Sequence, residues 1–259
     1  MSHGALQDLN LAGVRWELSE TPITSTSNTQ KTAQTVQNPT QSIASIAEIN
    51  RAPTSVVPPI APVQTISQET VNAMAARPND IPALIRMIGE FNHPLRTTAT
   101  NTVLPHIANN PNGLVLITDI PSSDDDASGN ILSGTTGELM DKMLAAIGTS
   151  RENVSIIPML FWRTPGGRTP NRIELDMTRP FIDRLIGMLN PRIILTMGSL
   201  PATEIAGVNL AKEHGKPVTI EGKPTIVPIY HPNYLILKPT AKRDVWNALQ
   251  NVQNILKSA

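Results

Sequence analysis

The 259-residue chain contains no cysteine. This absence excludes disulfide bridges, thiolate-ligated metal sites and iron–sulfur clusters held by cysteine. The sequence also has no apolar run long enough to cross a bilayer. Its first residues, MSHGALQDLNLAG, lack the basic and apolar regions of a secretion signal. We therefore expect a cytoplasmic protein that has no contact with membranes and binds no metal ion or other cofactor.

Charge of one sign and aromatic side chains are also scarce. Lys and Arg number 21, as do Asp and Glu, so the formal net charge is zero. A surface for nucleic acid therefore has to be a local basic patch. Only three Trp, two Tyr and three Phe are present, which limits platforms of stacked rings. Neither a GxxxxGKS nor a GxGxxG motif occurs, so a nucleotide-binding α/β protein is a weak hypothesis.

Composition divides the chain into three parts. Residues 1–19 can form a short N-terminal element. Residues 20–70 are rich in Thr, Ser, Gln and Pro, and they carry too little apolar surface to offset the entropy lost on folding. We expect them to be a flexible linker, and residues 79–259 to form the folded domain. The N-terminal segment is either a tail without a binding role or an arm for a protein partner, and we expect a monomer.

Short apolar runs alternate with helical periodicities in the expected domain. The runs that predict strands are 113–119, 154–160, 192–197 and 224–230. Asp80 can cap a first helix, and further helices are expected at 135–147, 173–189, 200–206 and 241–256. This alternation is typical of a three-layer α/β/α sandwich around a four-stranded, mainly parallel sheet.

Parallel sheets bind their ligands beyond the carboxyl ends of the strands. The loops expected there are 118–137, 161–172, 198–200 and 231–240. They are also the parts of the domain richest in Gly, Pro, Asp, Arg and His. A functional site is therefore expected among these loops.

Three segments at these loops have distinctive sequences: TDIPSSDDD at 118–126, PMLFWRTPGGRTP at 158–170 and HPNYLILKP at 231–239. In order and spacing they resemble motifs of the uracil-DNA glycosylase superfamily, closest to its family 4. The corresponding family motifs are Gly-Glu-Ala-Pro-Gly-x-x-Glu-Asp, Asn-x-x-x-x-Arg-Pro-Pro-x-x-Arg-x-Pro and His-Pro-Ser-Tyr-Leu-Leu-Arg-x-Pro. The resemblance covers residues 79–257 and implies the fold of that superfamily.

The resemblance implies hydrolysis of the N-glycosidic bond of a uracil flipped out of single- or double-stranded DNA, as in base-excision repair. In such a reaction a carboxylate and a positioned water stabilise or trap the sugar cation, and a donor near O2 of uracil stabilises the leaving base. By register the catalytic roles fall on Asp119, Asp125 and His231. Two simpler interpretations stay open, in which His231 caps its own turn and residues 124–126 form a solvated acidic loop.

The same register assigns the residues that contact the base or the DNA. They are Ile120, Pro121, Leu132, Pro158, Arg163, Arg168, Asn233 and Lys238. Arg163 and Arg168 match two family arginines that could meet phosphate or brace their loop. Leu237 stands at the position of another family Arg, and Lys238 beside it can partly compensate.

Several positions depart from the family pattern. Leu132 replaces a stacking Phe, and Pro158 replaces the Asn that reads uracil, so recognition by hydrogen bonds is expected to be weakened. The four cysteines of the family's iron–sulfur cluster are absent, and His93 and Trp162 lie at or near two of their positions. Two functions therefore stay open. One is a uracil-DNA glycosylase of full or weakened activity, and the other is a catalytically inactive DNA-binding or interaction protein on the same scaffold.

Overall fold

The computed structural model describes residues 67–257, which form one α/β domain around a single sheet. The strands are β1 (Leu114–Thr118), β2 (Ser155–Pro158), β3 (Ile193–Met197) and β4 (Thr225–Ile229), in the spatial order β2-β1-β3-β4. All neighbouring pairs are parallel, which confirms the predicted sheet. The predicted N-terminal element and almost all of the predicted linker lie outside the described residues.

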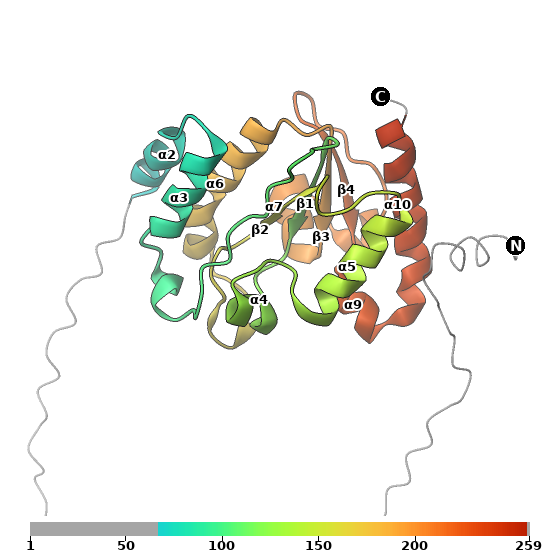
Figure 1. Ribbon diagram of the computed structural model, residues 1–259, viewed down its shortest axis with the longest axis horizontal. Coiled ribbons are helices and arrows are strands. Elements are labelled where there is room, and N and C mark those ends of the chain that lie inside the picture. The colour runs from blue at the N-terminus through green and yellow to red at the C-terminus, as the bar shows by residue number, and fades with distance from the viewer. Residues whose placement is uncertain (1–66, 258–259) are drawn as a thin grey trace, which may run out of the picture. The chain divides into compact units, whose positions relative to one another are not determined.

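Helices cover both faces of the sheet (Figure 1). One layer holds α2 (Gln68–Ala76), α3 (Ile81–Glu90), α6 (Arg172–Leu189) and α7 (Ser199–Ala206), and the other holds α5 (Gly134–Ala146) and α10 (Lys242–Lys257). Three short helices complete the described α-helices: α4 (Ser123–Ser128), α8 (Leu210–Glu213) and α9 (Pro232–Leu237). Single 3-10 turns occur at η1 (Pro94–Thr97), η2 (Pro165–Gly167) and η3 (Pro239–Ala241). The predicted three-layer sandwich is confirmed.

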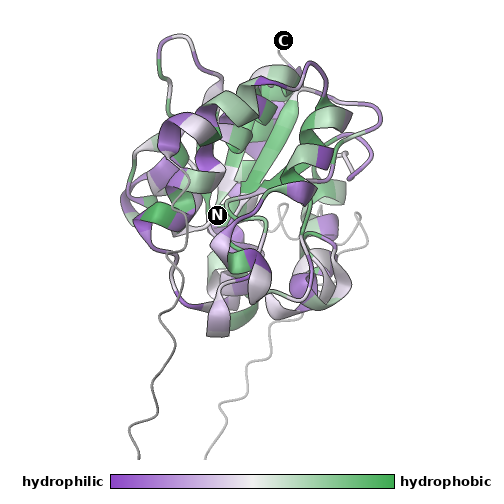
Figure 2. Ribbon diagram, turned by 90° about the vertical axis from the view of Figure 1, so that its left-hand side faces the viewer, coloured by the Kyte–Doolittle hydropathy of each residue, from purple (hydrophilic) through white to green (hydrophobic). Residues whose placement is uncertain are grey.

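The core occupies the space on both sides of the sheet, and the strands are almost entirely buried and mostly hydrophobic (Figure 2). Every residue of β1 is buried. Val115 and Ile117 belong to the hydrophobic cluster that includes residues of α2, α3 and α6. Since successive strand side chains point to opposite faces, Leu114 and Leu116 face the other layer. Burial on both faces explains why the strands appear in the sequence as continuous apolar runs.

Two of the predicted loops contain helices, and this corrects the sequence interpretation. Helix α4 forms at 123–128 because Ser122 and Asp125 make a reciprocal capping box. Helix α9 forms at 232–237 because His231 caps it and Pro232 occupies its first position. The acidic run is therefore the first turn of a helix, where carboxylates are favoured by the helix dipole. The sequence analysis also did not anticipate α2, which packs against α6.

The helix predicted to start after Asp80 is confirmed, since Asp80 Oδ1 accepts a hydrogen bond from the Ala83 N–H over 2.7 Å. Pro158 is tolerated in the sheet because it is the last residue of β2, an edge strand. The outer edge of β2 pairs with His106 through a bridge to Ile156. Within residues 67–257, no helix is both long enough and apolar enough to span a bilayer.

Candidate active site

His231 connects β4 to α9 at the carboxyl edge of the sheet. Its Nδ1 accepts a hydrogen bond from the backbone N–H of Asn233 over 3.2 Å, so the interpretation that His231 caps its own turn is confirmed. Its Nε2 lies 3.0 Å from Oγ1 of Thr118, the last residue of β1. Because β3 separates β1 from β4 in the sheet, the imidazole reaches across the end of β3. Capping therefore leaves one ring nitrogen free to contact a different strand.

Asp119 directly follows β1 and lies against the turn after β3. Its Oδ1 accepts the backbone N–H of Ile120 over 3.1 Å. A Cβ on Gly198 would lie only 2.6 Å from Asp119 Oδ2, and Gly198 has a φ of +109°. L-residues rarely adopt this backbone conformation. Glycine is therefore required at 198 both for the turn and for the close approach of the carboxylate.

Asp119 and His231 line one cavity of about 410 Å³. The other lining residues come from the segments after β3 and β4 and from α8 and α9: Gly198, Ser199, Leu210, Ala211, Tyr230, Asn233, Tyr234 and Leu237. Its volume falls in the range of about 300–1,000 Å³ that is usual for small-molecule pockets. The turns after the first and last strands thus converge on a space large enough for a pyrimidine.

Aromatic rings form one wall of this cavity. The rings of Tyr230 and Tyr234 are tilted by 37° with their centroids 4.8 Å apart, and the centroid of the His214 ring lies 4.1 Å from that of Tyr230. Lys238 Nζ lies 5.9 Å from the centroid of the Tyr234 ring, a cation–π distance. Tyr234 is 37% exposed, so part of its ring is available to a ligand. Two of the few rings of the domain are therefore gathered at this cavity.

Burial shifts the pKa values of Asp119 and His231 in opposite directions. Burial raises the pKa of the Asp119 carboxyl above its ordinary value, against a smaller opposing effect of the Ile120 N–H. Burial also lowers the pKa of His231 to about 4, and the negative charge of Asp125 opposes this shift only in part. At neutral pH the imidazole is therefore uncharged. Because Nδ1 is an acceptor, its single hydrogen is on Nε2.

Asp125 is buried, and both of its carboxylate oxygens accept backbone hydrogen bonds. Oδ2 accepts from Ser122 over 3.0 Å, and Oδ1 accepts from Ser133 over 2.6 Å. These contacts join the loop after β1 to the turn that enters α5. The carboxylate therefore holds two site loops together, and its catalytic role stays a prediction.

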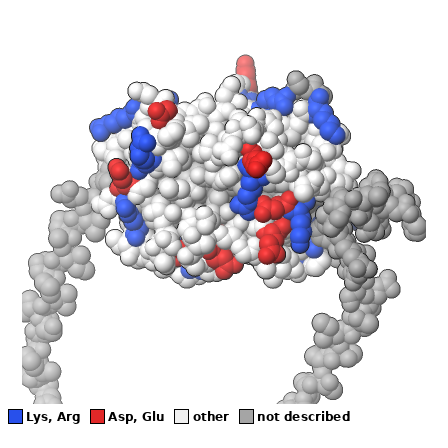
Figure 3. All heavy atoms as spheres, viewed as in Figure 1, with Lys and Arg blue, Asp and Glu red and all other residues white. Residues whose placement is uncertain are grey.

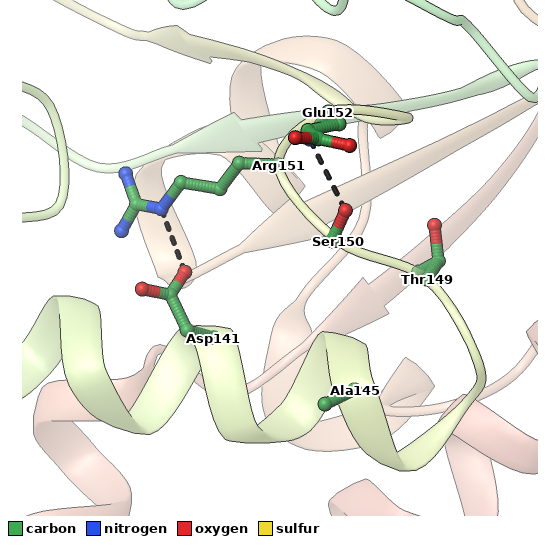
Figure 4. Close-up of a pocket in the computed structure, with 6 residues that line it drawn as sticks. All are labelled: Asp141, Ala145, Thr149, Ser150, Arg151 and Glu152. Atoms are coloured by element: carbon green, nitrogen blue, oxygen red, sulfur yellow. Dashed lines mark hydrogen bonds and ion pairs between the residues drawn. The ribbon is translucent and has the colours of Figure 1, made fainter.

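Four of the predicted base-contacting residues do not line the cavity. Ile120 packs against the hydrophobic core, and Pro121, Leu132 and Pro158 are buried. Leu132 has a φ of +51°, which is unusual for a leucine. Arg151 donates to the carbonyl oxygens of Ile131 and Leu132 over 2.9 and 2.7 Å, and so holds this turn in place. Figure 4 shows the same guanidinium paired with Asp141 on α5 at 2.6 Å.

The predicted DNA-contacting side chains have different surroundings. Arg168 forms a bidentate pair with Glu174 at the start of α6, so it braces its own loop. Arg163 is half-buried, and its Nε has no hydrogen-bond partner. Asn233 lines the cavity and Lys238 lies beside it, both exposed. On the face shown in Figure 3 basic and acidic side chains are intermixed, in keeping with the neutral net charge.

The position where the family resemblance implies an iron–sulfur cluster does not fit such a group. His93 and Trp162 are both fully buried and stack in parallel, with centroids 4.8 Å apart and planes 8° apart. His93 Nδ1 accepts the Leu95 N–H, and Nε2 lies 3.2 Å from the Glu174 carbonyl oxygen. Both imidazole nitrogens are thus engaged, and no thiolate is present. Among residues 67–257 no group of three or more His, Asp or Glu is arranged to hold a metal ion.

Three residues that help to build the site had no role predicted from the sequence. Thr118 contacts the imidazole, Gly198 makes room for Asp119, and Tyr230 forms part of the aromatic wall. One sequence signal was available, because each of the three lies at the carboxyl end of a predicted strand, where parallel sheets bind ligands. The sequence did not indicate which partner each residue contacts.

Comparison with known proteins identifies the family of the chain. The family model of the uracil DNA glycosylase superfamily matches residues 105–250. The type-4 uracil-DNA glycosylase of Archaeoglobus fulgidus is 28% identical over 159 residues, which are 58% of this chain and 79% of that protein. That of Thermotoga maritima is 28% identical over 146 residues, 55% of this chain and 76% of that protein. Because this family model matches more than half of its length, the chain belongs to the uracil DNA glycosylase superfamily, and its relatives make it family 4-like.

Proposed function

We propose that this protein hydrolyses the N-glycosidic bond of uracil flipped out of DNA, with Asp119 and His231 as the catalytic residues. The observation that supports this assignment is their shared cavity at the carboxyl edge of the sheet. The family relationship supplies the reaction class, because proteins named uracil-DNA glycosylases match most of this domain. The flipped nucleotide would place its base in the cavity.

In this mechanism Asp119 acts on the sugar and the attacking water. As the bond from C1′ to N1 breaks, its electron pair passes to the uracil ring, and C1′ becomes electron-deficient. The ionised Asp119 carboxylate stabilises that positive charge and orients a water molecule for attack on C1′. The water oxygen forms the new bond to C1′, and its proton passes to the carboxylate or to solvent. This role requires Asp119 to be ionised.

His231 acts on the leaving base. The negative charge of the uracil anion is shared by its carbonyl oxygens, and Nε2–H of a neutral imidazole can donate a hydrogen bond to O2. The low pKa of His231, about 4, keeps the ring uncharged at neutral pH. His231 is therefore a hydrogen-bond donor in this scheme and does not protonate the base. Loss of one such donor commonly slows an enzyme about 10²–10³-fold.

Residues at and near the same cavity can recognise the base and the phosphate backbone of the DNA. The exposed Asn233 amide can hydrogen-bond the polar edge of a pyrimidine, and the Tyr234 ring offers a stacking surface. Lys238, beside the cavity, can contact a phosphate, and so can Arg163 in the separate loop after β2, which makes binding dependent on salt. Asn233 and Tyr234 would thus recognise the base in place of the family Asn, whose position is occupied by Pro158 in this chain.

A second candidate function is a catalytically inactive DNA-binding or interaction protein. It is favoured by the buried positions of Leu132 and Pro158, which match the family residues that stack on and read uracil. A protein that lost those contacts could keep its fold and its surface for DNA. The two candidates differ in whether uracil is released.

The test is incubation of the full chain with a single-stranded oligonucleotide that carries one uracil, followed by alkaline cleavage of abasic sites. We expect a cut that is lost in Asp119→Asn and in His231→Ala. Asp183→Asn, a change in an exposed ion pair on α6, is the matched control and should retain the cut. No cut by the unmodified chain, together with salt-sensitive binding to the same oligonucleotide, would support the second candidate instead.

A further inference from the structure

The hydrogen-bond partners of His231 determine which ring nitrogen can act on a ligand. Nδ1 faces the backbone N–H of Asn233 at 3.2 Å and must be unprotonated to accept it. A neutral imidazole has one hydrogen, so that hydrogen is on Nε2. The nearest acceptor of Nε2–H is Oγ1 of Thr118 at 3.0 Å. The only donor of this imidazole is thus already bonded within the protein.

The Thr118 hydroxyl is well placed to keep this contact. Thr118 is the last residue of β1, is 4% exposed, and is fixed by strands on both sides. His231 is fixed in turn by its capping of α9. Thr118 does not line the cavity, whereas His231 does. A ligand in the cavity therefore meets the imidazole while the hydrogen on Nε2 points to the strand.

We infer that Thr118 is a positioning residue that holds the single N–H of His231 in the free protein, so that a pyrimidine carbonyl must displace the Thr118 hydroxyl to accept that hydrogen. The inference rests on the proposed function in assigning the ligand as a pyrimidine base. The contact between Thr118 and His231 itself does not depend on that function. In the family motif this position is Gly, which has no hydroxyl.

The energetic consequence follows from hydrogen-bond exchange. When a base replaces Thr118 as the partner of Nε2–H, the hydrogen bond to Thr118 is lost and a hydrogen bond to the base is formed. The net contribution of this exchange to the free energy of binding is therefore small. Without the hydroxyl, Nε2–H has no protein partner, and the base carbonyl gains the full bond. A hydrogen bond of ordinary net strength corresponds to roughly a tenfold change in affinity.

Thr118→Val removes the hydroxyl and keeps the branched shape of the side chain. We expect this variant to bind free uracil about tenfold more tightly than the unmodified chain, and to excise uracil faster by a similar factor. Thr118→Ser keeps a hydroxyl and should resemble the unmodified chain. Thr118→Gly introduces the family residue and should shift affinity in the same direction as Thr118→Val.

Thr196→Val is the matched control. Thr196 is a fully buried threonine on the neighbouring strand β3, and its Oγ1 has no hydrogen-bond partner. The same substitution there changes a similar strand position without touching His231. It should leave uracil affinity and the His231 signals unchanged.

The decisive measurement is ¹H–¹⁵N NMR of the imidazole in the full chain. We expect Nε2 of His231 to carry the hydrogen in every variant, and its exchange with solvent to be faster in Thr118→Val and Thr118→Gly than in the unmodified chain. The same exchange rate in all variants would overturn the inference, as would weaker uracil binding by Thr118→Val. If no variant excises uracil, the proposed function fails, whereas the imidazole signals still test the contact.

Discussion

At the scale of single residues, the cavity combines a carboxyl that resists ionisation with an imidazole that resists protonation. Burial raises the pKa of Asp119 and lowers that of His231 to about 4. The proposed chemistry uses the ionised acid and the neutral base. Burial thus keeps the imidazole in the neutral form that the proposed chemistry uses, whereas ionisation of the buried carboxyl lowers the stability of the fold.

Replacement of Asp119 by Asn should stabilise the fold at neutral pH while it abolishes uracil excision. Because the folded pKa of Asp119 is raised, its contribution to stability is present below the unfolded pKa and is lost as pH rises through the folded pKa. The Asn amide does not ionise, so the variant does not lose this stability as pH rises. We expect the melting temperature at pH 7 to rise, by roughly 2–4 °C for each kcal/mol that the substitution adds to the stability of a domain of this size. A melting temperature at or below that of the unmodified chain would contradict the raised pKa.

The acid side of the pH profile for excision should follow Asp119. His231 stays neutral down to about pH 4, so its protonation does not limit the rate above that pH. Excision should therefore decline as pH falls through the raised pKa of Asp119, because the carboxylate takes up a proton. Single-turnover rates check this over the range from neutral pH down towards the pKa of His231, about 4. A rate that is constant throughout it would contradict the role of Asp119.

Pro158→Asn tests whether the base is read at the family position. Pro158 is buried at the end of an edge strand and does not line the cavity. The new amide would be buried without an evident partner, which costs about 1–3 kcal/mol of stability. We expect urea denaturation to show that loss and the excision rate to stay unchanged. A clear rise in excision would show instead that a pocket at Pro158 still reads uracil.

At the scale of elements, turns without room for a side chain position the site. The turn between β3 and α7 needs glycine at 198, because a Cβ would lie 2.6 Å from Asp119 Oδ2. The first turn of α5 also leaves no room for a side chain, since a Cβ on Gly137 would overlap the carbonyl oxygen of Leu132. Arg151 holds that carbonyl from the loop before β2. The site loops are thus fixed by close backbone packing as well as by side-chain hydrogen bonds.

Gly198→Ala should therefore displace the Asp119 carboxylate. The methyl group conflicts with Oδ2, and the φ of +109° is unfavourable for alanine. We expect at least a tenfold loss of excision, since a small displacement of a catalytic group costs roughly that much or more. The matched control is Gly166→Ala, at an exposed glycine of positive φ with no atom within 4 Å of the added Cβ. Equal activity in both variants would argue against the positioning of Asp119 by Gly198.

At the scale of the whole molecule, a buried aromatic cluster lies where the family resemblance implies an iron–sulfur cluster. The His93–Trp162 stack is extended by Phe91, Phe161 and Phe181, with ring centroids 5.0 to 6.3 Å apart. Trp162 also donates from Nε1 to Thr102 Oγ1 over 3.0 Å. These rings join α3, the loop after β2, and α6 around one packed centre.

Trp162→Ala should be among the most destabilising single changes in the domain. Loss of a fully buried tryptophan commonly costs about 3–5 kcal/mol. Guanidinium denaturation monitored by far-ultraviolet circular dichroism measures the loss. Trp246→Ala, a change on α10 at a position that is only half-buried, is the control and should cost less. A similar small loss in both variants would show that the aromatic cluster does not stabilise the fold.

The sequence by itself determined the architecture. Continuous apolar runs and helical periodicities predicted a parallel sheet between two helical layers. This is possible because the spacing of apolar residues within an element depends on whether one or both of its faces are buried. The polar residues that follow each strand predicted the edge at which Asp119 and His231 meet. The absence of cysteine excluded a thiolate-ligated cluster without any coordinates.

The tertiary structure alone decided which groups are engaged. The contact of His231 with Thr118 joins residues 113 positions apart, on β1 and beyond β4, with β3 between these strands. The burial of Leu132 and Pro158 outside the cavity also depends on packing between distant elements. Local patterns record how far a residue is buried, whereas its hydrogen-bond partner depends on the packing of segments that are remote in the chain. For that reason the sequence predicted where the site lies, and only the fold decided what holds its donor.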